Sequence, residues 1–344
     1  MSGDAGPRAG TPGRRTLRGT LLVGGARILA ALPEAPLVAA ADGVGELWYR
    51  LSPARAAQAR ANLRRVCEGM AARGIGSRAA RRAATDPGAL ERLVRACYRQ
   101  TARYYLEVAR TGGYDLAQAA ARIEVETPDE VRSALMDGRP TVLVGMHFGA
   151  IELPVLYVVH LAGRRVTAPM ETVPDPELQR WVLSSRGSMG VDIVPLKDAR
   201  RPLVAALRRG DSIGIVNDRD ITGTGIPIPF FGVPAPFSPG AALLALETGT
   251  QVFVGSARRI RGRRYSGKLI GVPLPEEGTR REKVVALTTG IVRAFETLIA
   301  DAPEQWWGAF HAIWPDLAVT PEAGGHAASP PATPPSAGTP EEAA

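Results

Sequence analysis

The hydrophobic positions of the chain form short apolar runs that alternate with longer amphipathic stretches. Short apolar runs rich in β-branched residues and bounded by turn signals are typical of strands buried on both faces of a parallel sheet. We expect such strands at 123–125, 141–146, 165–168, 190–195, 211–217, 251–258 and 264–272. The alternation of strands with helical stretches predicts an α/β fold with a mostly parallel, doubly wound sheet flanked by helices.

The amphipathic stretches carry apolar residues at helical spacing. Helices are expected at 54–69, 87–110, 129–136, 153–161, 176–187, 201–209, 239–248 and 283–300. Ser52 and Pro53 supply an N-cap and a first-turn proline for the first of these helices. The pattern therefore predicts one domain over 17–317, with a helical N-terminal part at about 17–120 and an α/β core at about 121–317.

Both ends of the chain have a composition that is too poor in apolar bulk to pack. Residues 1–16 are rich in Gly, Pro and Arg, and residues 318–344 are mostly Pro, Ala, Gly, Thr and Glu, so both segments are expected to be disordered. The segment 17–41 is apolar but is interrupted by charges and prolines, and it lacks the roughly 18 uninterrupted apolar residues of a spanning helix. It also lacks a signal-peptide cleavage pattern. Two interpretations remain open, an amphipathic segment on a membrane surface and a core helix.

Composition narrows the function classes. The chain has 344 residues, of which 45% are hydrophobic, and this is enough for a sizeable core. Its 42 basic and 34 acidic residues give a formal charge of +8, which suits a nucleic acid, an anionic membrane surface or an acidic substrate. Without zinc-finger spacing, an RNP-like strand or a P-loop, we expect no nucleic-acid partner. Two cysteines indicate neither a disulfide framework nor a cysteine metal site, and no metal is expected.

The strongest chemical signal is a histidine at the end of the 141–146 strand. His147 follows this strand directly, and Glu152 stands five positions later. In open α/β sheets ligands bind at the carboxyl ends of the strands. On a continuous helix residues five apart diverge by roughly 140°, so the two side chains converge only if the backbone bends, and Gly149 permits such a bend.

The pair of His147 and Glu152 allows a structural and a catalytic interpretation. A single histidine beside an apolar strand is often a hydrogen-bonded core residue. Among the four histidines, however, only His147 follows a strand and precedes a carboxylate at close range. A neutral imidazole can take a proton from a hydroxyl, and a carboxylate can fix its tautomer. The pair is therefore a candidate for hydroxyl activation without a protein nucleophile.

The motif resembles the His-x4-Asp/Glu motif of glycerolipid and lipid A acyltransferases. The likeness continues through Met170-Glu171, Arg186-Gly187, Asp218-Arg219-Asp220 and Pro229-Phe230-Phe231-Gly232, and then through 303–307 and 313–316. The order and spacing resemble the bacterial lipid A late acyltransferases and the related phosphatidylinositol mannoside acyltransferases, over roughly residues 20 to 317. Glu152 in place of Asp is the form of the lipid A branch, whereas the Asp218 context is closest to the mannoside enzymes.

The resemblance implies a site and a reaction. His147 would act as general base with Glu152, while the substrate-binding residues would be Glu171, Arg186, Asp218, Arg219 and Asp220. No cofactor is implied. The donor would be acyl-CoA or acyl carrier protein, and the acceptor a hydroxyl of a phosphoglycolipid such as phosphatidylinositol mannoside. The enzyme would work peripherally on an anionic membrane surface, at the cytoplasmic face of the cell membrane. The alternatives are a lipid A-type or lysophospholipid acyltransferase, a thioesterase, and a non-catalytic lipid-binding protein.

Three further groups of residues each allow a functional and a structural interpretation. Without the resemblance, Asp218-Arg219-Asp220 would equally be a capping or salt-bridge cluster at the sheet edge. The proline-rich stretch 226–234 is expected as an exposed apolar loop that either lines an acyl-chain groove or packs across the sheet end. Trp306, Trp307 and Trp314 fit either a membrane-interface belt or the core.

Overall fold

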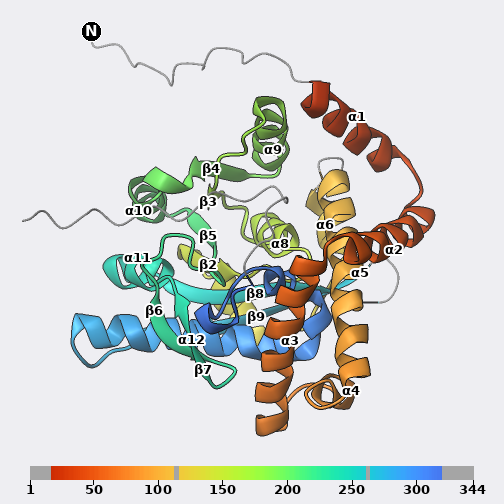
Figure 1. The fold of residues 1–344 in the computed structure, drawn as a ribbon. Helices are drawn as coiled ribbons and strands as arrows, with labels where there is room; N and C mark the ends of the chain where they lie inside the picture. Colours follow the sequence, from red (N-terminus) through yellow and green to blue (C-terminus); the bar gives the residue numbers. More distant parts are fainter. Residues whose placement is uncertain (1–16, 112–115, 261–263, 320–344) are drawn as a thin grey trace, which may run out of the picture.

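The computed structural model describes residues 17–111, 116–260 and 264–319, and its centre is a seven-stranded sheet (Figure 1). The strand order is β1-β9-β8-β2-β5-β3-β4, and among the described residues of this sheet only the β8–β9 pair is antiparallel. The strands are β1 (Ile123–Val125), β2 (Thr141–Gly145), β3 (Val166–Met170), β4 (Val191–Pro195), β5 (Ser212–Val216), β8 (Gln251–Arg259) and β9 (Tyr265–Val272). The predicted α/β fold with a mostly parallel sheet is confirmed.

Helices cover both faces of this sheet, because each central strand is apolar on both sides. Val142 and Val144 of β2 belong to the large core that includes residues of the helices at 240–248 and 280–301, whereas Leu143 packs with Val158 of the helix at 152–162. The helices of the α/β part are α7 (Asp129–Met136), α8 (Glu152–Ala162), α9 (Pro176–Ser188), α10 (Arg200–Arg209), α11 (Gly240–Thr248) and α12 (Arg280–Asp301). Short 3-10 turns, η2 (Pro303–Gln305), η3 (Trp307–Phe310) and η4 (Pro315–Leu317), follow α12; another, η1 (Leu196–Asp198), follows β4.

The N-terminal part is helical, as expected, but its first segment is divided. The helices are α1 (Leu17–Ala31), α2 (Glu34–Leu51), α3 (Pro53–Arg73), α4 (Arg78–Arg82), α5 (Pro87–Thr111) and α6 (Leu116–Ala121). Pro33 interrupts the main-chain hydrogen bonding and separates α1 from α2. Ser52 is not the expected side-chain cap of α3, since its hydroxyl donates to the carbonyl of Trp48 in α2. The predicted disordered segment 1–16 and the tail from 320 lie outside the described residues.

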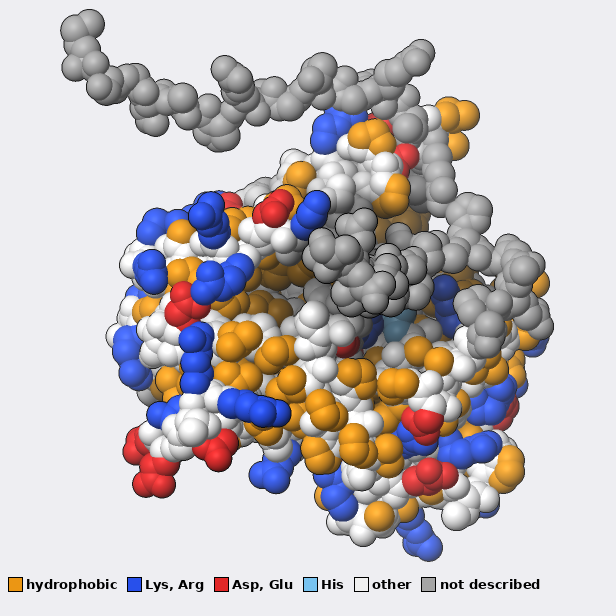
Figure 2. Space-filling model, turned by 60° about the vertical axis from the view of Figure 1, so that its left-hand side comes forward, with side chains coloured by type: hydrophobic (Ala, Val, Ile, Leu, Met, Phe, Trp, Pro, Cys, Tyr) orange, Lys and Arg blue, Asp and Glu red, His pale blue; other side chains and the backbone are white. Residues whose placement is uncertain are grey.

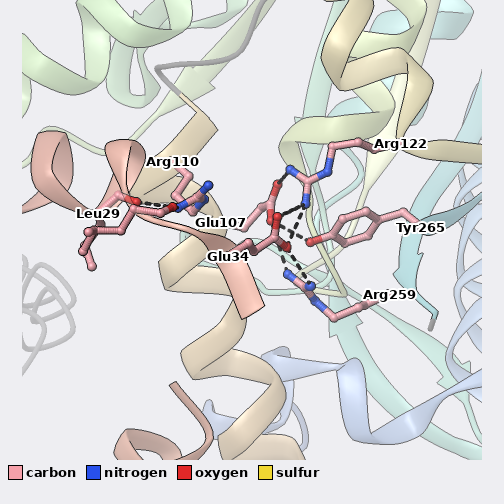
Figure 3. A network of polar contacts seen from close by, with 8 residues as sticks. Leu29, Glu34, Glu107, Arg110, Arg122, Arg259 and Tyr265 are labelled. Atoms are coloured by element: carbon pink, nitrogen blue, oxygen red, sulfur yellow. Dashed lines mark hydrogen bonds and ion pairs between the residues drawn. The ribbon is translucent and has the colours of Figure 1, made fainter. Parts of the chain in front are cut away.

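A network of buried charges fixes α2 and α5 to the sheet (Figure 3). Glu107 accepts hydrogen bonds from Arg122 at 2.6 Å, from Arg259 at 3.2 Å and from the Tyr265 hydroxyl at 2.9 Å. Arg122 also pairs with Glu34, at the start of α2, at 3.2 Å. Burial, and then the charge of Glu107, raise the pKa of Tyr265 well above its usual value, so the phenol remains a donor.

The proline-rich stretch is a two-stranded antiparallel ribbon, β6 (Ile226–Phe230) and β7 (Val233–Phe237), and not the expected loop. Its alternate residues Ile228 and Phe230 are buried, and Phe230 stacks on Trp314 with ring centroids 5.2 Å apart. Trp306 and Trp314 are also fully buried. The packing interpretations of the ribbon and of these two tryptophans are therefore confirmed. No helix in the described part of the chain is long and apolar enough to cross a membrane.

Candidate active site

His147 lies in a loop at the carboxyl end of β2, and the main chain of the C-terminal segment holds this loop. The Gly149 N–H donates to the carbonyl of Gln305 at 3.0 Å, and the Gly308 N–H donates to the carbonyl of His147 at 3.1 Å. The expected bend occurs at Gly149, where φ is +56°. The 303–308 segment thus closes over the strand end and fixes the histidine backbone.

Replacing Gly149 with Ala is expected to destabilise this loop strongly. A Cβ at Gly149 would lie 2.1 Å from the Ala257 carbonyl oxygen, in addition to the cost of a positive φ. We expect the free energy of unfolding to fall by more than the roughly 1–2 kcal/mol of left-handed strain alone. Gly163→Ala is the matched control, since Gly163 has φ +61° and a Cβ added there would meet no atom within 4 Å. Equal losses in urea unfolding would contradict the steric argument.

The side chain of His147 pairs with Asp218. Its Nδ1 lies 2.5 Å from Asp218 Oδ1, while its main-chain N–H donates to Asp218 Oδ2 at 3.0 Å. The indole N–H of Trp306 donates to the same Oδ2 at 3.0 Å. Asp218 is 1% exposed and follows β5, which is the neighbour of β2 in the sheet. Parallel pairing of the two strands therefore brings the two side chains together.

This arrangement defines the tautomer of the histidine. Burial alone would raise the pKa of Asp218, but the charge of His147 and the hydrogen bonds from His147 and Trp306 outweigh it and lower that pKa. An ionised carboxylate only accepts hydrogen bonds, so Nδ1 carries the proton and donates it. The lone pair then remains on Nε2, as a general base requires.

The predicted pairing of His147 with Glu152 needs correction. Although both residues are described, no hydrogen bond or ion pair joins them; Glu152 instead accepts from Arg186 at 3.0 Å and from the Tyr104 hydroxyl at 3.2 Å. Glu152 is the first residue of α8, which begins after the bend at Gly149. Its side chain therefore lies beside Arg186 and Tyr104 and not beside His147. Asp218 takes the orienting position that was expected for Glu152.

An apolar cavity of about 330 Å³ adjoins His147, between the sheet and helices α8 and α9. Its lining is largely aliphatic and includes Leu143, Val155, Met170, Met189, Ile193 and Ile215. Three strand glycines, Gly145, Gly214 and Gly255, also line it and leave room where side chains would stand. In Figure 2 a histidine side chain is visible in a hollow that hydrophobic side chains border. The catalytic candidate thus faces a space suited to a hydrocarbon chain.

The predicted substrate-binding residues divide into two groups. Glu171, Arg186 and Arg219 line the cavity, as His147 and Glu152 do. Asp218 is buried behind His147 and is not placed to contact a substrate. Asp220 also departs from the prediction, because it holds its own loop: it accepts from the Gly225 N–H at 2.7 Å and from Thr222 at 3.2 Å.

Several aromatic neighbours of His147 were not predicted as site residues. The Trp307 ring meets the His147 ring edge-on with centroids 4.5 Å apart, and it stacks on Tyr104 at 4.5 Å. Arg219 donates to Nε2 of His311 at 2.9 Å. The only sequence signal was the aromatic run 306–314, which fitted either a membrane-interface belt or the core and gave no partner for His311.

His311 is expected to make the fold sensitive to acid. Burial, then the charges of Arg219 and His147, lower its pKa from 6.5 to about 3, so it stays neutral in the folded state. The unfolded chain takes up this proton near pH 6.5, so the free energy of unfolding falls as the pH drops from 6.5 toward about 3. The slope is at most about 1.4 kcal/mol per pH unit.

Urea unfolding between neutral pH and about pH 5 checks this expectation. His311→Gln should flatten the dependence, whereas His160→Gln, at an exposed position of α8, should leave it unchanged. An unchanged slope in His311→Gln would contradict the assignment of the acid sensitivity to His311.

Within the described residues, no group of three or more His, Cys, Asp or Glu side chains is arranged to hold a metal ion.

Comparison with known families and with known proteins gives acyltransferases in both cases. Residues 12–314 match the family described as bacterial lipid A biosynthesis acyltransferase. The chain is 29% identical over 219 residues to a phosphatidylinositol mannoside acyltransferase of Mycolicibacterium smegmatis, covering 62% of this chain and 70% of the relative. A protein of the same name from Mycobacterium tuberculosis is 27% identical over 211 residues, covering 59% of this chain and 65% of the relative, a little under two thirds of it.

Proposed function

Since the chain belongs to the bacterial lipid A biosynthesis acyltransferase family, we propose that it transfers a fatty acyl group from a thioester to a hydroxyl of a phosphoglycolipid such as phosphatidylinositol mannoside. The observation that carries this proposal is the His147–Asp218 pair beside an apolar cavity. The names of the relatives support the choice of acceptor. The donor is acyl-CoA or acyl carrier protein.

The reaction needs one base and no protein nucleophile. Nε2 of His147 takes the proton of the acceptor hydroxyl while the hydroxyl oxygen attacks the thioester carbonyl carbon. The carbon–sulfur bond then breaks, the ester forms, and the departing sulfur takes the proton from the imidazolium. Asp218 keeps the proton on Nδ1 beforehand and stabilises the imidazolium during the reaction.

The cavity beside His147 combines an aliphatic lining with two arginines, and both features suit the acyl donor. The aliphatic lining takes the donor's acyl chain, because burying its methylenes gains roughly 0.8 kcal/mol each. Arg186 and Arg219 contribute positive charge in the same cavity, which favours the phosphate groups of the thioester donor. Glu152 holds Arg186 in place by the ion pair at 3.0 Å.

Exposed apolar side chains on the N-terminal helices support peripheral membrane binding at the cytoplasmic face, where acyl thioesters are available. These residues are Leu17, Leu21, Ile28 and Leu32 with Val44, Leu47 and Leu51. Large apolar side chains that gather on one part of a surface mark interaction sites. The enzyme would rest on the membrane that carries its acceptor.

The test is an assay of the purified chain with labelled acyl-CoA and a mycobacterial lipid extract, followed by mass spectrometry. Labelled phosphatidylinositol mannoside is the expected product. Free fatty acid that added lipid does not diminish would indicate a thioesterase. No labelled lipid with either acyl-CoA or acyl carrier protein would contradict acyl transfer and favour a non-catalytic lipid-binding protein.

A further inference from the structure

A second apolar space lies among the N-terminal helices. It is a groove of about 440 Å³ between α1, α2 and α5, lined by Leu29, Leu37, Ala40, Ala41, Val44, Trp48, Ala102, Tyr105 and Leu106. This groove shares no lining residue with the cavity beside His147. All of its lining residues are apolar or aromatic, and two of them, Val44 and Tyr105, are 60% and 55% exposed.

A continuous series of aromatic rings connects this groove to the catalytic histidine. Tyr105, in the groove, is 5.4 Å from Tyr104 between ring centroids. Tyr104 stacks on Trp307 at 4.5 Å, and Trp307 lies against His147 at 4.5 Å. Trp48, the last residue of α2 that lines the groove, is 6.3 Å from Tyr105. The groove is therefore separated from His147 by three successive ring contacts.

A positive charge lies at the Trp48 end of the groove. The Arg55 guanidinium lies over the Trp48 ring at 5.6 Å from its centroid, and Arg55 is exposed. Among the described residues it has no carboxylate partner. Its charge also reaches His311, where it is one of the smaller contributions that lower the pKa of that histidine. An apolar groove with an exposed cation beside one end matches a lipid with a phosphate beside its fatty chains.

We propose that this groove holds a fatty chain of the acceptor phosphoglycolipid and that Arg55 binds its phosphate. The inference rests on the proposed function, because acyl transfer to a glycolipid brings two kinds of hydrocarbon chain to one histidine. The cavity between the sheet and α8 holds the donor chain, and the α1–α2–α5 groove holds a chain that the acceptor already carries. The acceptor hydroxyl then approaches His147 from the side of Trp307.

Two acceptors and two matched pairs of variants test the proposal. The acceptors are phosphatidylinositol dimannoside in mixed micelles and its deacylated head group, each with palmitoyl-CoA as donor. Val44→Glu places a charge in the groove, and Leu47→Glu places the same charge on α2 outside the groove, at a residue of similar exposure, 55%. Arg55→Gln removes the cation, and Arg64→Gln removes an exposed arginine of the same helix that has no ion pair among the described residues.

Val44→Glu should lower kcat/KM by about tenfold or more for the lipid acceptor and leave the deacylated acceptor unchanged, because only the lipid has a chain to bury. Arg55→Gln should raise KM for both acceptors without a matching change in kcat, and Arg55→Lys should restore part of the loss. Arg64→Gln should stay near the parent enzyme, whereas Leu47→Glu, on the proposed membrane-binding surface, should lose clearly less activity toward the lipid acceptor than Val44→Glu does.

Two outcomes would overturn the proposal. Equal losses in Val44→Glu and Leu47→Glu would show a general membrane contact in place of a chain-binding groove. A loss in Val44→Glu that is the same for both acceptors, or no loss at all, would remove the groove from acceptor binding. These failures differ from a failure of the proposed function, in which the parent enzyme itself would acylate neither acceptor.

Discussion

His147→Gln is expected to lower kcat for acyl transfer by at least about a hundredfold, because the amide of Gln cannot take the proton of the acceptor hydroxyl. Gln has nearly the length of the imidazole and should keep the shape of the cavity, so KM for acyl-CoA should change little. Steady-state kinetics with labelled acyl-CoA and the lipid acceptor give both constants. Circular dichroism and urea unfolding show whether the variant still folds.

His160→Gln provides the matched control for this change. His160 lies on α8 and is exposed, so the substitution should leave kcat within about twofold, as surface changes usually do. If His147→Gln retains nearly full activity, general-base catalysis by His147 is wrong. A rate limited by product release would be recognised by single-turnover kinetics, in which the loss would appear even if kcat were unchanged.

The sequence was sufficient to place His147 and Asp218 each at the end of a buried strand, but it did not show that the two strands are neighbours. The residues are 71 positions apart, and the pairing of β2 with β5 depends on the order of strands across the whole sheet. Glu152 was a natural partner in the sequence because it is close along the chain. The bend at Gly149 and the start of α8 send its side chain toward Arg186 instead.

The ribbon β6–β7 shows a second reason why the sequence did not predict the whole fold. Its residues alternate between proline and larger apolar side chains, which is the two-residue period of a strand, yet prolines cannot donate ladder hydrogen bonds and are usually found outside strands. In the structure Pro227 pairs with Pro236 and Pro229 with Pro234, so the prolines occupy facing positions of the ribbon. The alternate positions remain free for hydrogen bonding and packing. Propensity therefore indicated a loop where the period indicated a strand.

For the tryptophans of the C-terminal aromatic segment, the sequence left burial and a membrane-interface position equally open, and it did not place them in the site. Trp306 contributes an indole N–H to Asp218, and Trp307 contributes a ring to His147. Both contacts arise because η2 and η3 return across the carboxyl end of the sheet after α12. Nothing in the local sequence specifies this return, since it is set by the length and packing of α12 against the sheet.

Asp218→Asn is expected to reduce kcat by on the order of a thousandfold, although the change is nearly isosteric. Oδ2 accepts two N–H groups, from the His147 main chain and from Trp306. The carbonyl oxygen of Asn must take this position, because its amide group cannot accept. The NH2 group then faces Nδ1 of His147, which has to become an acceptor, and the imidazole proton moves to Nε2, where it prevents base catalysis.

Glu152→Gln measured under the same conditions separates the two possible partners of His147. Glu152 contacts Arg186 and Tyr104, and Gln keeps an acceptor oxygen, so the neutral variant should weaken the hold on Arg186 and lower kcat by no more than about tenfold, roughly the worth of one ordinary hydrogen bond. If Glu152→Gln loses as much activity as His147→Gln while Asp218→Asn remains active, the orienting role belongs to Glu152. In that case the contacts of Asp218 serve to fix the loop and not the tautomer. The opposite ranking would establish that the orienting carboxylate comes from the neighbouring strand β5.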